Sequence, residues 1–291
     1  MKHDLKNTNM KKPSRRKFLQ LTGIGIAGSM LPGKIANGQF NIETRENKIP
    51  FELGLASYSL REFSLDETLK MTTRLGLTNI AFKSMHLPLD SNETQINEAV
   101  SKVKKAGLNL YGAGVIYMAN EEEVNRAFKY AQTAGLKVII GVPEHNLLPL
   151  VEEKVKAYDI KLAIHNHGPG DKRYPSAESA YEKIKNMDLR MGLCLDIGHT
   201  QRLGIDPAKT ASQFMDRLHD VHIKDVDKST AEGKAIEIGR GVIDIPSFLK
   251  VLIEERYSGK VSFEFEKDGN DPLPGLAESV GYVRGCLDML S

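Results

Sequence analysis

Six of the eight histidines occur at the same kind of place in the chain, at or just after a short run of β-prone residues. They are His86, His145, His165, His167, His199 and His222. One histidine at such a place is more often structural, but the carboxyl ends of parallel strands open on one face, so six would converge there. Imidazoles brought together in this way can ligate a transition metal or move protons near neutral pH.

Carboxylates fall at matching positions. Asp196 ends the run Gly-Leu-Cys-Leu-Asp, and Glu264 and Glu266 alternate in Phe-Glu-Phe-Glu. Side chains at i and i+2 share one face of a strand, so the two glutamates can lean to the same side, as can His165 with His167. A mixed oxygen and imidazole set suits Mn²⁺, Zn²⁺, Co²⁺ or Fe²⁺ better than Ca²⁺, which prefers oxygen alone. We therefore expect one divalent metal ion, with Mn²⁺ as the first choice.

The elements that must position these residues follow an alternating pattern. From residue 51 on, short β-rich runs alternate with segments of 3.6-residue periodicity, which is typical of a parallel sheet covered by helices. The predicted strands are 52–57, 77–83, 108–114, 136–142, 160–166, 190–196, 218–224 and 260–266. Eight such pairs in about 250 residues predict an α/β fold of the (β/α)8 TIM-barrel type. The predicted helix N-caps include Ser64, Asn120, Asp206 and Asp244.

A doubly wound open sheet is the main alternative fold. Such a fold typically has a glycine-rich phosphate-binding turn after its first strand. The segment at the end of the predicted first strand, Leu55-Ala56-Ser57-Tyr58-Ser59, contains no glycine. This difference favours the barrel.

The charge of the chain is unevenly distributed. Its 291 residues carry a formal net charge of +2, but residues 1–38 hold eight Lys/Arg and one Asp, which leaves the remainder at −5. An acidic body disfavours nucleic acid and anionic membranes as partners, because both require a cationic face. Two cysteines are too few for a disulfide framework.

The N-terminus resembles a twin-arginine export signal. Ser14-Arg15-Arg16-Lys17-Phe18-Leu19 opens a weakly hydrophobic run that ends before the small residues Ala36-Asn37-Gly38. The resemblance implies a signal peptide over 1–38, a linker over 39–50, the barrel over 51–291, the twin-arginine machinery as a partner and a periplasmic location. Two alternatives stay open, a basic tail before a short helix and an uncleaved membrane anchor, although glycines interrupt the apolar run.

Five segments, taken in order, resemble the xylose isomerase-like barrel superfamily. They are Leu162-Ala163-Ile164-His165-Asn166-His167, Cys194-Leu195-Asp196-Ile197-Gly198-His199, Asp220-Val221-His222-Ile223-Lys224-Asp225, Gly239-Arg240-Gly241-Val242-Ile243-Asp244 and Phe263-Glu264-Phe265-Glu266. That group holds sugar isomerases, ketose 3-epimerases, inosose and dehydroshikimate dehydratases, and DNA-repair enzymes of the endonuclease IV type. The resemblance covers roughly residues 51–290.

The resemblance implies a set of metal ligands. Asp196, His222 and Glu264 match the ligands on strands six, seven and eight, and His165 stands where the ketose epimerases have a fourth ligand, a glutamate. Because that glutamate also serves there as one of two opposed bases, its replacement weakens an assignment as a plain ketose 3-epimerase.

Further residues are expected around a sugar substrate. His199 resembles a residue that hydrogen-bonds the ligand, and Lys224 resembles one that faces the site. Strand parity and loop position add a second group, for which solvated or structural roles stay open: Lys83, His86, Glu144, Arg240 and Glu266.

This set of residues predicts proton abstraction next to a carbonyl of a keto-sugar, through a metal-stabilised enediolate. The expected base is Glu264 or His165, and the expected acid is His167, His199 or Lys224. An isomerase or epimerase is the first expectation. A keto-sugar dehydratase or 3-keto-glycoside lyase on the same metal site is the alternative, because loss of a β-oxygen shares the first step.

Two other classes of function remain for comparison. A noncatalytic carbohydrate-binding protein is compatible with the fold, since a fold does not fix a function. A repair endonuclease would need a cationic groove for DNA, which the acidic body does not offer. A homodimer is compatible with exposed barrel helices, although no residue specifies an interface.

Overall fold

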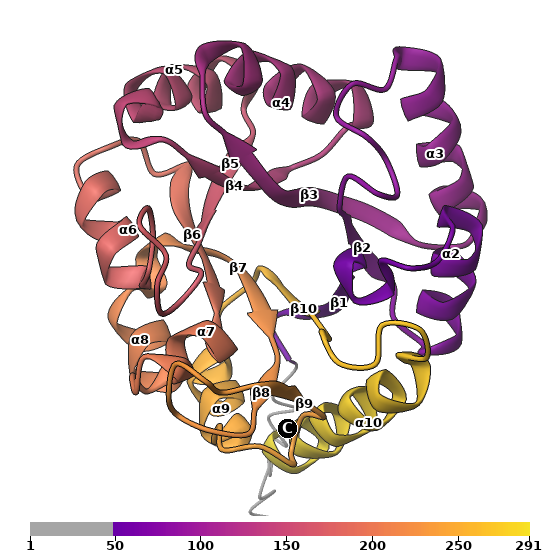
Figure 1. Ribbon diagram of the computed structural model, residues 1–291, viewed down its shortest axis with the longest axis vertical. Coiled ribbons are helices and arrows are strands. Elements are labelled where there is room, and N and C mark those ends of the chain that lie inside the picture. Colours follow the sequence, from indigo (N-terminus) through magenta and orange to yellow (C-terminus); the bar gives the residue numbers. More distant parts are fainter. Residues whose placement is uncertain (1–48) are drawn as a thin grey trace, which may run out of the picture. The chain divides into compact units, whose positions relative to one another are not determined.

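The computed structural model describes residues 49–291, which form a closed barrel of eight parallel strands surrounded by helices (Figure 1). Around the barrel the strands follow the order β1, β10, β7, β6, β5, β4, β3, β2. The predicted TIM barrel is confirmed and the open sheet is excluded. The bounds of the strands are β1 Glu52–Ala56, β2 Asn79–Phe82, β3 Asn109–Met118, β4 Val138–Pro143, β5 Lys161–His165, β6 Met191–Asp196, β7 Leu218–Ile223 and β10 Lys260–Phe263.

The helices make the outer ring and begin at the expected caps. The side chains of Ser64, Asn120, Asp206 and Asp244 each accept a hydrogen bond from the first turn of the helix that follows. The helices are α2 Leu65–Arg74, α3 Glu93–Lys105, α4 Glu121–Ala134, α5 Leu148–Tyr158, α6 Ala177–Ile184, α7 Ile197–Arg202, α8 Pro207–Gln213, α9 Ile245–Glu254 and α10 Leu273–Leu290, with short 3-10 turns η1 Ser57–Leu60, η2 His145–Leu147 and η3 Met215–Arg217.

Strand β3 departs from the prediction, because it continues past residue 114 to Met118. Two glycines at its middle explain the difference. A Cβ atom on Gly112 would lie 2.8 Å from Val138, and one on Gly114 would lie 2.2 Å from the carbonyl oxygen of Ile140. The absence of a side chain at these two positions therefore allows β3 to pass close to β4. Because glycine has a low strand propensity, the predicted strand ended at residue 114.

The loop after β7 also contains a feature that was not predicted. A short antiparallel hairpin pairs β8 Asp225–Val226 with β9 Ala235–Ile236. It lies between α9 and α10 in the view of Figure 1.

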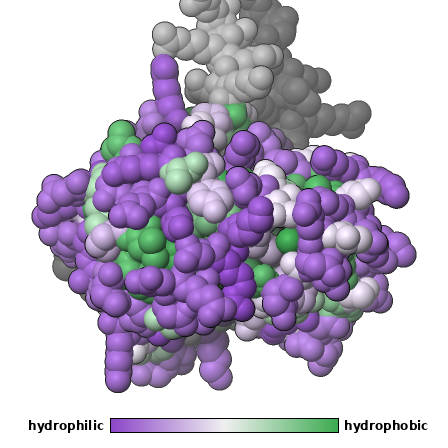
Figure 2. All heavy atoms as spheres, turned by 90° about the horizontal axis from the view of Figure 1, so that it is seen from above, coloured by the Kyte–Doolittle hydropathy of each residue, from purple (hydrophilic) through white to green (hydrophobic). Residues whose placement is uncertain are grey.

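The apolar residues form two layers. The larger layer lies between the strands and the helices, and a smaller cluster lies inside the barrel: Ala81, Tyr111, Val138, Ile140, Ala163 and Cys194. The outer surface seen in Figure 2 is mostly hydrophilic, with small separate hydrophobic patches. Within residues 49–291 no helix combines the length and the apolar character that crossing a membrane requires.

The predicted signal peptide and most of the predicted linker lie outside the described residues, which begin at 49.

Candidate functional site

Four side chains from neighbouring strands converge at the carboxyl end of the barrel. Nε2 of His165 lies 3.1 Å from Nδ1 of His222 and 3.4 Å from Oδ2 of Asp196. Nδ1 of His222 lies 3.2 Å from Oε2 of Glu264. One ligand atom from each residue lies within 4.8 Å of every other, and all four residues are buried.

The residues of this cluster fit a divalent transition-metal ion. Bonds of about 2.0–2.2 Å to nitrogen and oxygen would place adjacent ligand atoms roughly 3.0–3.5 Å apart, which is the spacing found here. Oδ2 of Asp196 is buried and makes no hydrogen bond, although the ammonium of Lys224 lies beside it. The mutual approach of His165 Nε2, His222 Nδ1, Asp196 Oδ2 and Glu264 Oε2 makes the cluster a candidate metal-binding site.

Lys224 lies against the same cluster. Its Nζ is 2.9 Å from Oδ2 of Asp196, 2.6 Å from Oε2 of Glu264 and 2.8 Å from Oε1 of Glu266. The ammonium group therefore offsets part of the negative charge that three carboxylates would otherwise concentrate in a buried place.

Local structure fixes the direction of Asp196. As the N-cap of α7, it accepts a hydrogen bond from the backbone of His199 through Oδ1, so Oδ2 is left to face the cluster. Asn166 clamps the same residue, because its side chain accepts from the backbone N–H of Asp196 and donates to the backbone oxygen. The strand register then pairs Asp196 with His222.

The electrostatics of the cluster favour a cation. Burial lowers the pKa of His165 to about 3, so this imidazole is neutral. Burial alone would lower the pKa of His222, but the Glu264 carboxylate beside it raises that pKa above its usual value. Burial would raise the pKa values of Asp196 and Glu264, yet nearby cationic groups, among them Lys224, hold both below the usual range. Both carboxylates are therefore ionised.

A cavity of about 220 Å³ opens above the cluster, and it brings together most of the predicted site residues. Its lining comprises Tyr58, Lys83, Val115, Tyr117, His165, His167, His199, Glu264 and Glu266. The predicted residues Lys83, His167, His199 and Glu266 thus share one cavity with two of the cluster residues.

Tyr58, Val115 and Tyr117 in this lining were missed by the sequence analysis. The phenol oxygen of Tyr117 lies 2.9 Å from Nε2 of His167, so the two side chains form a hydrogen-bonded pair. The alternation that exposes residues 115 and 117 on one side of β3 could have identified them, but the predicted strand stopped at residue 114.

His86 does not line the cavity, contrary to the expectation. Its ring is buried and bonded on both sides, with Nδ1 2.9 Å from the hydroxyl of Ser57 and Nε2 2.9 Å from that of Thr68. Burial lowers its pKa, and backbone carbonyls of Leu60 and Phe63 complete its surroundings. The ring therefore joins η1 to α2 and acts as a structural histidine. His145 is likewise bonded to a backbone carbonyl, that of Arg173.

Arg240 lies on the surface, where it pairs with Glu278 on α10. The Gly-Arg-Gly segment has a structural explanation, because the carboxylate of Asp225 accepts hydrogen bonds from the backbone of Gly239, Gly241 and Ile243. A Cβ atom on Gly241 would lie 2.2 Å from that carboxylate. The motif therefore shapes a turn and places Arg240 outside the cavity.

Glu144 also lies outside the cavity lining. It forms an ion pair with Arg173, whose guanidinium lies 5.7 Å from the ring of Tyr117. Glu144 therefore does not line the cavity itself, but it holds Arg173, which lies near the lining residue Tyr117.

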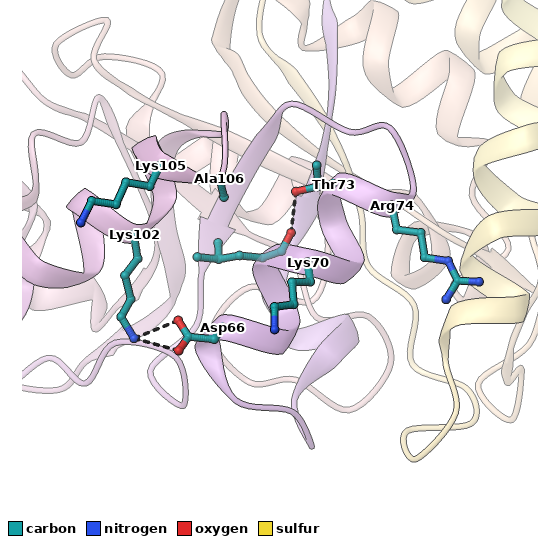
Figure 3. Close-up of a pocket in the computed structure, with 8 residues that line it drawn as sticks. Asp66, Lys70, Thr73, Arg74, Lys102, Lys105 and Ala106 are labelled. Carbon is teal, nitrogen blue, oxygen red and sulfur yellow. Dashed lines mark hydrogen bonds and ion pairs between the residues drawn. The ribbon is translucent and has the colours of Figure 1, made fainter.

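A larger cavity, of about 670 Å³, lies between α2 and α3 on the outside of the barrel (Figure 3). Lys102 is paired with Asp66 there, and Lys70, Arg74 and Lys105 carry further positive charge. It holds no histidine and only one carboxylate, so the smaller cavity is the candidate active site despite its size.

Comparisons with known proteins agree with this architecture. Residues 51–286 match the family described as xylose isomerase-like TIM barrel. The chain therefore belongs to this family.

Two curated relatives match shorter stretches. The rhizopine catabolism protein MocC of Rhizobium meliloti is 27% identical over 148 residues, which is 45% of this chain and 44% of the relative. Inosose dehydratase of Salmonella agona (strain SL483) is 31% identical over 128 residues, which is 38% of this chain and 42% of the relative. The match thus spans less than half the length of either relative.

A solved structure supports the fold. The structure of an L-ribulose 3-epimerase is similar with a TM-score of 0.68 and 17% identity, covering 82% of this chain and 95% of the other.

Proposed function

We propose that this protein is an enzyme that uses a divalent metal to remove a proton next to a carbonyl of a keto-sugar, in an isomerase or epimerase reaction. The observation that carries the proposal is the convergence of His165, Asp196, His222 and Glu264 below a small polar cavity. Mn²⁺ is the proposed metal, because two carboxylates and two imidazoles suit it.

A bound divalent cation would withdraw electrons from a substrate carbonyl and the adjacent hydroxyl and thereby acidify the C–H group between them. Glu264 is the proposed base. Its contacts with Lys224 and His222 use Oε2, which leaves Oε1 to accept the proton. Lys224 fixes the direction of this carboxylate and of Glu266.

The pair of Tyr117 and His167 is the proposed acid. Burial raises the pKa of the Tyr117 phenol, so it keeps its proton and can donate it within the pair. The pair lines the cavity together with Glu264, so a sugar between them could receive a proton at a carbon or an oxygen. His199 completes this side of the cavity as a ligand-binding residue.

Dehydration, or elimination from a 3-keto-glycoside, is the second candidate. Two observations favour it. First, His165 stands where the ketose epimerases have a second glutamate, so the cluster lacks that opposed base. Second, inosose dehydratase is among the relatives. In this reaction the acid pair would protonate a departing oxygen instead of returning a proton to carbon.

The experiment is solvent exchange at carbon. Mn²⁺-loaded protein is incubated in D₂O with free and glycosidic keto-sugars, and NMR spectra are recorded. We expect deuterium at the carbon next to the carbonyl, and the product separates an epimer or isomer from a dehydrated sugar. Glu264→Gln should abolish the exchange, whereas Arg240→Ala, outside the cavity, should leave it unchanged.

Sugar binding without exchange in any member of the panel would contradict the proposal and identify a carbohydrate-binding protein instead.

We also propose export by the twin-arginine pathway, based on Arg15 and Arg16 within their motif. Changing both residues to lysine should keep the full-length protein in the cytoplasm, as measured by cell fractionation. Unchanged export of the variant would contradict this proposal.

A further inference from the structure

We propose that the substrate is a sugar acid whose carboxylate is bound by Lys83, one of the residues that line the cavity. This inference rests on the proposed function, because it concerns the ligand of the same cavity.

The surroundings of Lys83 differ from those of Lys224. Lys224 has carboxylate oxygens of three residues within 2.9 Å. Lys83 follows β2, and Nζ donates to the backbone oxygen of Val115 at 2.5 Å. In residues 49–291 it forms no ion pair with a carboxylate, and its nearest ring is Tyr117, 5.8 Å away. The ammonium group of Lys83 has three N–H donors and uses one of them on Val115, so the other N–H groups can donate to a ligand in the cavity.

Charge balance around the cavity points to an anion. Lys224 shares its charge among the carboxylates of Asp196, Glu264 and Glu266, and a divalent cation bound by the cluster would offset the remaining negative charge. Arg173, behind Tyr117, is matched by Glu144. Lys83 is the lysine of the cavity lining, and within residues 49–291 it forms no direct ion pair, although the Glu264 carboxylate across the cavity is close enough to act on its charge. Desolvation makes such a group costly and lowers its pKa.

The chemistry favours a carboxylate over a phosphate. A phosphate group carries up to two charges and is usually held by several backbone N–H groups, whereas Lys83 offers a single ammonium. The cavity of about 220 Å³ is smaller than the range of roughly 300–1,000 Å³ found for drug-sized ligands, so it suits one sugar unit. Tyr58 and Tyr117 supply aromatic walls for the C–H face of such a ring.

The test compares matched acids and neutral sugars on Mn²⁺-loaded protein by calorimetry. D-Fructuronate is compared with D-fructose, and D-tagaturonate with D-tagatose, so that each pair consists of a keto-sugar acid and its neutral keto-sugar. A charge-assisted hydrogen bond contributes about 1.5–3 kcal/mol, so at least one acid should bind roughly tenfold or more tightly than its neutral partner. Lys83→Met should remove that preference and change the affinity for the neutral sugar less than about threefold.

Lys70→Met, on the outer face of α2, is the matched control and should alter neither affinity. Inorganic phosphate at the same concentration should not compete with the acid. If Lys83→Met does not fold, the ratio of acid to neutral affinity in the wild type still decides the question.

The inference is overturned if no acid in the panel is preferred, or if Lys83→Met weakens acid and neutral sugar equally. Metal content is measured in the same samples. Protein that holds metal but shows no preference contradicts this inference alone, whereas protein that cannot hold metal contradicts the proposed function.

Discussion

The histidines near the rim of the barrel differ in what their ring nitrogens contact. His165 and His222 each leave one buried nitrogen without a hydrogen bond and turn the other toward carboxylate oxygens. Both nitrogens of His86 are bonded to hydroxyl groups. The sequence places these residues at similar positions, so their roles depend on partners that are distant in the chain, such as Ser57 for His86.

Replacing His86 should therefore affect stability and not the site. His86→Ala leaves the Thr68 hydroxyl without its side-chain partner, removes one of the two partners of the Ser57 hydroxyl and opens a cavity, so we expect a loss of about 2–4 kcal/mol in the free energy of unfolding. Urea denaturation measures this loss, and Mn²⁺ affinity should stay within about twofold of the wild type.

His145→Ala is the comparison, because it removes one hydrogen bond from a partly exposed ring and should cost about 1 kcal/mol. A His86→Ala variant that keeps its stability but binds sugar more weakly would contradict the structural role and indicate that His86 binds the substrate.

His219 on β7 should make the stability depend on pH. Burial lowers its pKa to about 4, and Nε2 lies 2.9 Å from the backbone oxygen of Leu189. Between pH 6.5 and about 4 the unfolded chain binds a proton at this residue and the folded chain does not, so stability falls as the pH falls through this window.

His219→Gln keeps a donor for Leu189 and should reduce that decline by roughly 1–2 kcal/mol, since the partly exposed ring is screened by solvent. Unfolding midpoints in urea at several pH values provide the measurement. Parallel pH profiles for variant and wild type would refute the assignment.

Among the elements, the loop after β7 depends on one buried carboxylate. Asp225 accepts backbone hydrogen bonds from Val226, Gly239, Gly241 and Ile243, and thereby folds the hairpin of β8 and β9 toward the start of α9. The loop thus owes its conformation to Asp225 and not to Arg240.

Removing that carboxylate should loosen the loop without opening the barrel. In Asp225→Ala, amide hydrogen exchange over residues 239–243 should accelerate by at least tenfold, while exchange in β10 stays near the wild-type rate. Gly241→Ala should act similarly, because its Cβ would collide with Asp225. Unchanged exchange in both variants would contradict this role.

Elements that depend on local sequence geometry could be predicted, whereas those that depend on packing between strands could not. Alternation and spacing predicted the strands that carry Asp196 and His222, since the i, i+2 rule depends on local geometry alone. The end of β3 was missed because Gly112 and Gly114 lower strand propensity, although packing against Ile140 requires them. Tyr117 was missed with it, so one wall of the cavity was absent from the expected site.

At the scale of the whole molecule, the closed barrel brings the ends of distant segments together. The register that pairs Asp196 with His222 and Ser262 with His222 sets the positions of three strands next to one another. His165, on β5, and Glu264, after β10, approach the same point from both sides. The ordered motifs predicted this convergence, whereas the contacts of Lys224 with three carboxylates required the three-dimensional structure.

The most direct measurement is Mn²⁺ binding to the chelator-treated protein by calorimetry, with Asp196→Asn as the decisive variant. Asparagine can still cap α7, so the fold should persist while the charged ligand is lost. We predict about one equivalent bound by the wild type and by the control Asp206→Asn, and affinity lower on the order of 100-fold for Asp196→Asn. Equal binding by Asp196→Asn, or no binding by the wild type, would contradict the metal centre.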